Sequence, residues 1–164
     1  MQYQKSKFFW KQENGHKLII SEPYDDNCEY YSYLKEKRNV GMSQVIITSR
    51  LMIELIKTIY TQYKGSVSKI EFAEEDDELD EQTNRILESL RNERAYLTNL
   101  LELLQALNEK TSIDISRIYF RLEYQDQDIA AYLQANGIVG INAIDGKELL
   151  TKMCRFLESK IFYD

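Results

Sequence analysis

The sequence predicts an α/β protein in which helices pack on a small mixed sheet. Three observations predict this class: a hairpin signal near the N-terminus, a long leucine-rich segment in the middle, and alternating strand-like and helix-like segments in the last third. The chain of 164 residues is long enough to bury a core. No Pro- or Gly-rich linker divides it, so we expect a single domain over residues 1–164.

The N-terminal β-hairpin is predicted over residues 8–20. Asn14-Gly15 separates two β-prone runs, and this dipeptide favours a two-residue turn because both of its positions need a positive φ. Such a turn places Trp10 opposite Ile19 and Phe9 opposite Ile20. A short Tyr-rich helix is expected after it, over about residues 28–37.

The segment from residue 45 to residue 72 predicts a strand, a helix and a second strand. Residues 45–47 form an apolar run and are expected to be a buried strand. Residues 48–64 place apolar side chains on one face at helical spacing, and Gly65 follows where a helix cap belongs. Residues 66–72 alternate between apolar and polar side chains, which indicates a half-exposed strand. The face of the helix is formed by Met52, Leu55, Ile56, Ile59 and Tyr63.

The longest helix is predicted over about residues 79–109. Nine positions from 79 to 107 follow alternating steps of four and three, and seven of them are Leu or Ile. This spacing is typical of a coiled-coil seam. It offers more apolar surface than a small sheet covers, so we expect a homodimer that associates through Leu90, Leu97 and Leu104.

The last third is predicted to be a β-α-β-α unit. Residues 116–124 alternate cleanly as a strand, residues 126–135 are interpreted as a short helix, and residues 138–141 form a second strand. Asp145 is a candidate cap for a final helix that ends near residue 160.

Acidic side chains are concentrated in residues 71–81, where eight of eleven positions are Asp or Glu. The rest of the chain sums to +2, so this run accounts for the whole net charge of −6. Its centre is predicted to bind a basic protein partner by electrostatic attraction. Two other interpretations stay open: a solvated lead-in to the following helix, and a site for a divalent cation, although the spacing of a calcium loop is absent. The candidate partner-binding residues are Glu74, Glu75, Asp76, Asp77 and Glu78.

Several classes of chemistry lack their required residues. His16 is the only histidine and lies beside a turn, which leaves no Ser-His-Asp triad and no two-histidine metal centre. Phosphate-binding glycine loops are absent, and Cys28 and Cys154 lie too far apart in sequence to suggest a zinc pair. We therefore predict no catalytic residue, metal or cofactor. The lack of a signal segment and of a long apolar run predicts a cytoplasmic protein with no membrane contact.

Two functional classes remain. The favoured class is a non-enzymatic macromolecule-binding or regulatory module that acts by protein–protein contact, for example in neutralising a toxin or a defence system. The alternative is a metal-dependent, carboxylate-based nuclease or nucleotide-processing enzyme. A nucleic-acid contact is the less favoured partner, and its candidate surface is one face of the strand at 116–124, formed by Arg117, Tyr119 and Arg121. The candidate polar side chains for the enzyme are Asp114, Asp126, Asp128, Asp145 and Lys147.

Overall fold

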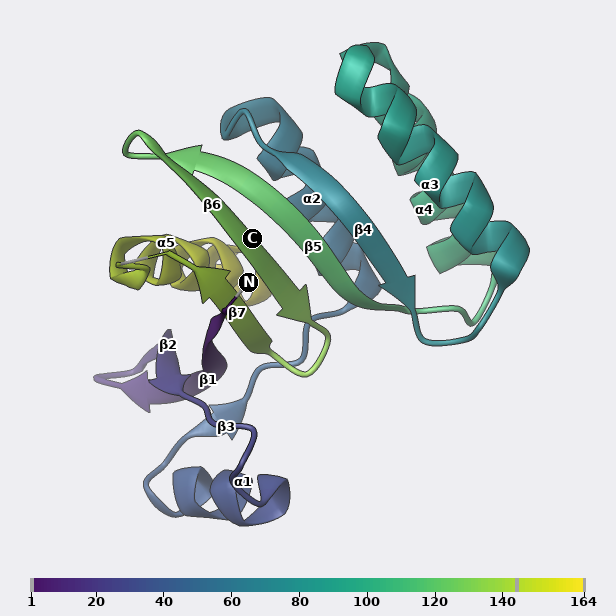
Figure 1. Ribbon diagram of the computed structural model, residues 1–164. Coiled ribbons are helices and arrows are strands. Elements are labelled where there is room, and N and C mark those ends of the chain that lie inside the picture. The colour runs from purple at the N-terminus through teal and green to yellow at the C-terminus, as the bar shows by residue number, and fades with distance from the viewer. Residues whose placement is uncertain (1, 144, 164) are drawn as a thin grey trace. The chain divides into compact units, whose positions relative to one another are not determined.

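The computed structural model describes residues 2–143 and 145–163 and contains five α-helices and seven β-strands (Figure 1). This confirms the α/β class. The chain divides into two compact units, which we name the terminal unit (residues 1–46 and 136–164) and the central unit (residues 47–135). Whether they fold as the single domain predicted from the sequence stays a prediction.

Four strands belong to the terminal unit, and β1 pairs with the other three. All three pairings are antiparallel. The N-terminal hairpin is confirmed: Trp10 lies opposite Ile19 and Phe9 opposite Ile20, and the turn residues Asn14 and Gly15 have φ values of 52° and 79°. The strands are β1 (Gln4–Glu13), β2 (His16–Pro23), β3 (Ser43–Gln44) and β7 (Ile138–Asn142).

The predicted strand at residues 45–47 is wrong. The strand β3 ends at Gln44, and the Ile46 side chain is 59% exposed. An apolar run of three residues is too short to specify its own pairing, because strand identity depends on the neighbour that completes the hydrogen-bond ladder.

Two α-helices complete the terminal unit. Helix α1 (Tyr30–Asn39) begins two residues after the predicted start, because the Glu29 carboxylate accepts hydrogen bonds from the first backbone nitrogens and fixes the N-terminus there. Helix α5 (Lys147–Glu158) packs on β2 and continues into the π-helical segment η2 (Ser159–Tyr163). It buries Leu149, Met153, Cys154 and Leu157.

One lysine lies inside the core of the terminal unit. The Lys7 side chain is fully buried, and its ammonium group donates a hydrogen bond to the carbonyl oxygen of Asn136. Its Nζ atom lies 5.6 Å from the ring centroid of Phe9 and 5.7 Å from that of Tyr30. Burial lowers the pKa of Lys7 to about 8, because the charged form loses its hydration.

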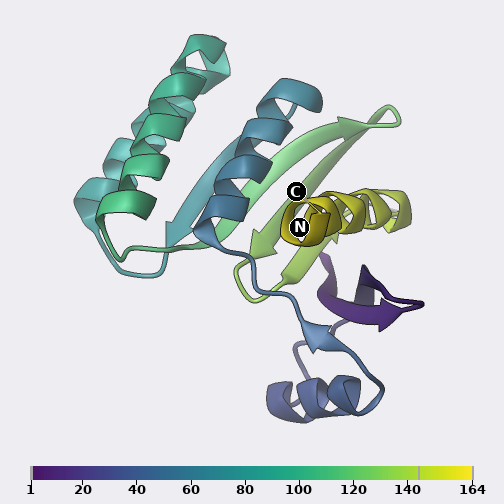
Figure 2. The same ribbon diagram turned by 180° about the vertical axis from the view of Figure 1, so that it is seen from behind.

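The central unit is built on three antiparallel strands in the order β6–β5–β4. Helix α2 packs on β4 and β5 (Figure 2). It buries four residues of the predicted apolar face, whereas the fifth, Tyr63, follows the end of the helix and is half-buried. Thr48 caps this helix by accepting a hydrogen bond from the Leu51 nitrogen at 3.2 Å. The strands are β4 (Ser66–Phe72), β5 (Ile115–Tyr124) and β6 (Gln127–Gln134), and the helix is α2 (Ser49–Gln62).

The single long helix predicted over residues 79–109 is wrong. Helix α3 (Asp77–Asn92) stops before Glu93, which is extended, and the short turn η1 (Arg94–Tyr96) leads into α4 (Leu97–Lys110). Helices α3 and α4 lie side by side, with α3 against β4 and α4 against α2 (Figures 1 and 2). The break lets both apolar stripes pack within one unit, whereas a continuous helix of thirty residues would span about 45 Å.

The predicted helix at residues 126–135 is also wrong, because residues 127–134 form the strand β6. Gln125 and Asp126 have φ values of 51° and 62° and make a two-residue turn between Tyr124 and Gln127. Positive φ at both positions is the geometry of a tight hairpin, but the usual Asn-Gly signal is missing here. The β-α-β-α unit is therefore replaced by three successive strands and one helix.

Candidate functional site

Part of the acidic run starts helix α3. Asp76 is the N-cap, and its carboxylate accepts a hydrogen bond from the Leu79 nitrogen at 3.0 Å. Asp77 and Glu78 follow in the first turn, where negative charge interacts favourably with the helix dipole. The interpretation of the run as a lead-in to a helix is therefore confirmed for these three residues.

Four other carboxylates of the run line a cleft of about 360 Å³ beside β4 and α3. We name it the acidic cleft, because it contains four carboxylates and one lysine and so carries a net charge of −3. Strand β4 contributes four of its residues, the following loop two and α3 two. The lining residues are Lys69, Ile70, Glu71, Phe72, Glu74, Glu75, Asp80 and Asn84.

Three carboxylates in the acidic cleft are available to a cationic group of a partner. Glu71 already lies 3.5 Å from Lys69 Nζ and 4.0 Å from Arg117 Nε. Within the part of the chain that the structure describes, the carboxylates of Glu74, Glu75 and Asp80 make no hydrogen bond or ion pair, and all three residues are exposed. A cationic side chain entering the cleft would therefore meet three unpaired negative charges.

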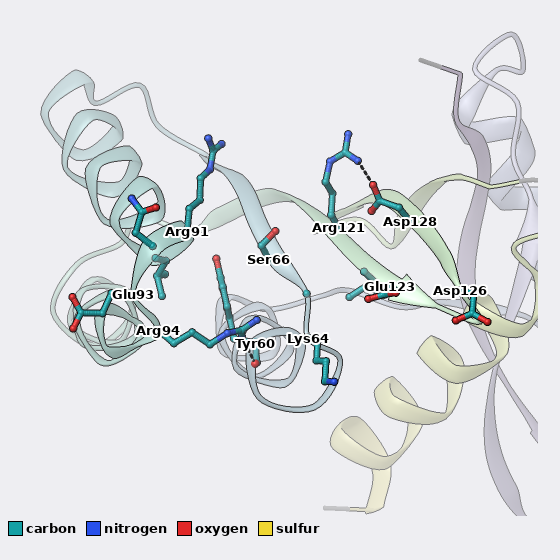
Figure 3. A pocket seen from close by; sticks show the side chains of 14 residues that line it. Tyr60, Lys64, Ser66, Arg91, Glu93, Arg94, Arg121, Glu123, Asp126 and Asp128 are labelled. Carbon is teal, nitrogen blue, oxygen red and sulfur yellow. Dashed lines mark hydrogen bonds and ion pairs between the residues drawn. The ribbon is translucent and has the colours of Figure 1, made fainter.

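A larger open pocket of about 720 Å³ lies at the other end of β4. Its cations Lys64, Arg91, Arg94 and Arg121 equal its four carboxylates in number, so its net charge is zero. Arg94 donates to the carbonyl oxygen of Tyr60 at 2.6 Å, and Arg121 donates to Asp128 at 3.0 Å (Figure 3). Because its charges balance, the pocket shows no preference for a ligand of either sign.

The structure brings together only part of the predicted partner-binding set. Glu74 and Glu75 line the acidic cleft, whereas Asp76, Asp77 and Glu78 belong to the start of α3. Asp80 and Asn84 were missed, although their spacing of four residues places them on one side of a helix. Both residues lie inside the helix predicted over about residues 79–109, but neither was named as a site residue.

The predicted nucleic-acid face is present on β5, but its cations have acceptors in the protein. Arg117 donates to the Tyr119 hydroxyl at 2.7 Å and to Gln134 at 2.9 Å, and it stacks 5.1 Å from the ring centroid of Tyr132. Burial alone would lower the pKa of Arg117, but the hydrogen bond to Tyr119 and the nearby Glu71 raise it above its usual value. Binding of nucleic acid by this face stays a prediction.

The predicted self-association residues are mostly inside the central unit. Leu90 and Leu104 are buried, and Leu97 is half-buried. Two of the three leucines thus already pack against their own chain. Homodimerisation stays a prediction, but in this fold the side chains of Leu90 and Leu104 are not at the surface.

Three of the four carboxylates considered for an enzyme have structural contacts, and the fourth, Asp126, lines the larger pocket. Asp114 accepts a hydrogen bond from the Ser49 hydroxyl at 3.2 Å, Asp128 pairs with Arg121, and Asp145 accepts from the Lys147 nitrogen at 3.2 Å. Over residues 2–143 and 145–163, no three His, Cys, Asp or Glu side chains are grouped so that they would hold a metal ion.

Comparison with protein-family models, with curated proteins and with solved structures found no match. In the described part of the chain, every helix is too short or too polar to cross a bilayer. The fold and the cleft define a mixed α/β protein with an acidic cleft beside an edge strand.

Proposed function

We propose that this protein is a non-enzymatic macromolecule-binding module that acts by protein–protein contact, and that its acidic cleft receives a basic segment of the partner. The observation that supports the proposal is the set of three unpaired carboxylates, Glu74, Glu75 and Asp80, in a cleft with a net charge of −3. Neutralising a basic toxin or a defence protein is a regulatory role that such a contact would serve.

The side chains that line the acidic cleft support a protein partner. Phe72 lies half-buried among the charged residues, whereas Ile70 is already buried in the core, so Phe72 is the apolar side chain that the cleft offers beside its charges. The attraction steers a basic partner before contact, while Phe72 adds apolar burial once the partner is bound.

The experiment is crosslinking capture of partners from the native cells with three forms of the chain. The cleft variant carries Glu74→Gln, Glu75→Gln and Asp80→Asn. The matched variant carries Glu88→Gln, Glu102→Gln and Glu109→Gln, which remove the same charge from exposed positions on α3 and α4 outside the cleft.

The native chain and the matched variant should recover the same basic protein, identified by mass spectrometry, and the cleft variant should lose most of it. Equal recovery of that protein by the cleft variant would contradict the proposal. Both variants leave the Asp76 cap in place, so a loss of binding would not reflect a lost helix start.

A further inference from the structure

We propose that the partner's segment binds as an extended strand paired with the free edge of β4, with lysine or arginine side chains entering the acidic cleft. This inference rests on the proposed function and adds the binding mode and the kind of segment. It is carried by three features of the central unit: the pairing of β4, the position of α3, and the charge of the space beside them.

Strand β4 is an edge strand of the central unit. It pairs with β5 on one side, and the described residues place no strand on its other side. An edge strand presents unpaired backbone groups that can bind an added strand. At Val67 the backbone N–H on this edge is not available to an added strand, because it donates a hydrogen bond to the Tyr60 hydroxyl at 3.0 Å. Further along β4, residues 69–72 line the acidic cleft instead.

Helix α3 forms the opposite wall of this space. Asp80 and Asn84, one turn apart on α3, line the acidic cleft together with β4. Near the other end of the helix, Leu90 and Arg91 line the larger pocket together with Ser66, the first residue of β4 (Figure 3). Open space therefore lies at both ends of the strand, but neither cavity is lined by Val67 or Ser68, and Leu87 of α3 is buried between the two cavities. The added segment would therefore pair with residues 69–72, about 13 Å of strand.

The charge of the cleft selects the side chains of this segment. Alternate residues of a strand point to the same face and lie roughly 7 Å apart, so a lysine at every second position would place successive ammonium groups along the carboxylates. Register shifts on either side of residues 69–71 leave only a short stretch of β4 in regular register. Backbone bonding over so few residues is limited, so the charge contacts must contribute to the affinity.

The test uses fluorescently labelled nine-residue peptides in which lysine alternates with threonine, titrated with the full chain and followed by anisotropy. Two derivatives carry backbone N-methyl groups, one on every lysine nitrogen and one on every threonine nitrogen. Successive N–H groups of a strand point to opposite edges, so only one derivative blocks the edge that pairs with β4.

Strand addition predicts that one N-methylated derivative binds about tenfold more weakly, while the other stays within about twofold of the parent peptide. The cleft variant should bind the parent peptide about tenfold more weakly than the matched variant does. No binding of the parent peptide, equal affinities of the three peptides, or an equal loss in both derivatives would overturn strand addition.

Failure of this inference is distinguishable from failure of the proposed function. Equal affinities of the three peptides, together with weaker binding by the cleft variant, would leave the acidic cleft as a site for basic segments without backbone pairing. Equal binding of the parent peptide by the cleft and matched variants would count against both proposals. A peptide of alternating glutamate and threonine is the control for charge and should not bind.

Discussion

The Tyr60 hydroxyl accepts a hydrogen bond from the Val67 nitrogen at 3.0 Å and ties the end of α2 to the edge of β4. Both residues are buried, so no water replaces this bond if the hydroxyl is removed. Tyr60→Phe should therefore lower the free energy of unfolding by about 1–2 kcal/mol, because the Val67 N–H is left without a partner. Urea denaturation measures the change.

The control for Tyr60→Phe is Tyr31→Phe on α1, where the side chain is 77% exposed. Water satisfies a hydroxyl at such a position, so this substitution should leave stability within about 0.5 kcal/mol of the native chain. Equal effects of the two substitutions would show that the Tyr60 hydroxyl does not hold the strand edge.

Thr83 on α3 offers a stabilising change. Its side chain is 1% exposed, and its hydroxyl is the one buried side-chain polar atom without a hydrogen bond in the described part of the chain. Thr83→Val replaces that hydroxyl with a methyl group of similar size and should raise the free energy of unfolding by about 1 kcal/mol. Thr98→Val, at an exposed position of α4, is the control. A clear loss of stability in Thr83→Val would mean that the hydroxyl has a partner.

The Asp76 cap can be separated from the charge of the acidic run. Asp76→Ala should cost about 1 kcal/mol of stability, because the Leu79 nitrogen loses its acceptor. Asp76→Asn removes the same charge but keeps a capping oxygen, so its free energy of unfolding should stay close to the native value. Thermal or urea denaturation of the two variants decides the matter: equal losses would assign the effect to charge and not to capping.

Lys7 should make stability depend on pH in the alkaline range. The folded state has a pKa of about 8 and the unfolded chain about 10.5, so between these values the unfolded chain binds more protons. The free energy of unfolding should therefore rise with pH, by about 1.5 kcal/mol from pH 8 to pH 9.5 through this residue. Below about pH 7 the residue is charged in both states and contributes no slope.

Lys7→Met should remove this rise, whereas Lys35→Met at an exposed position of α1 should retain it. The measurement is urea denaturation of the three proteins at pH 8.0, 8.8 and 9.5, values chosen to lie roughly between the two pKa values. A slope in Lys7→Met that matches the native slope would show that Lys7 does not titrate between these values.

The first hairpin and helix α2 were predicted from the sequence because short sequence patterns specify them. Asn14-Gly15 fixed both the turn and the register of the first hairpin, and the apolar stripe located α2. At Gln125-Asp126 the same kind of turn is formed by residues with no strong preference for positive φ, so the following strand was mistaken for a helix. Strand pairing supplied what the local sequence did not specify.

The break between α3 and α4 was hidden by a pattern that continues through it. Leucine spacing is the same for one long helix and for two helices that fold back on one another, since each helix has its own apolar stripe. Glu93, a charged residue at a seam position, was a local sign of the break. In the folded chain, Arg94 follows the break and donates a hydrogen bond to the carbonyl oxygen of Tyr60.

The candidate site was predicted only in part. The centre of the acidic run was predicted to bind and includes Glu74 and Glu75, but the cleft also needs Glu71 from β4 and Asp80 from α3, at the two ends of the run. Their proximity depends on how the strand and the helix pack, which the charge pattern does not specify. The burial of Lys7 was missed for a similar reason, because a lysine beside two phenylalanines in a strand gives no sign of which face it occupies.

The most direct test of the acidic cleft is the association rate of the captured partner across a salt series. Attraction to the cleft acts over a Debye length of about 8 Å at physiological ionic strength, so the on-rate of the native chain should fall as salt rises, while the off-rate changes less. The cleft variant should associate more slowly at low salt and depend less on salt, and the matched variant should follow the native chain. Identical low-salt on-rates for the native chain and the cleft variant would contradict the proposal.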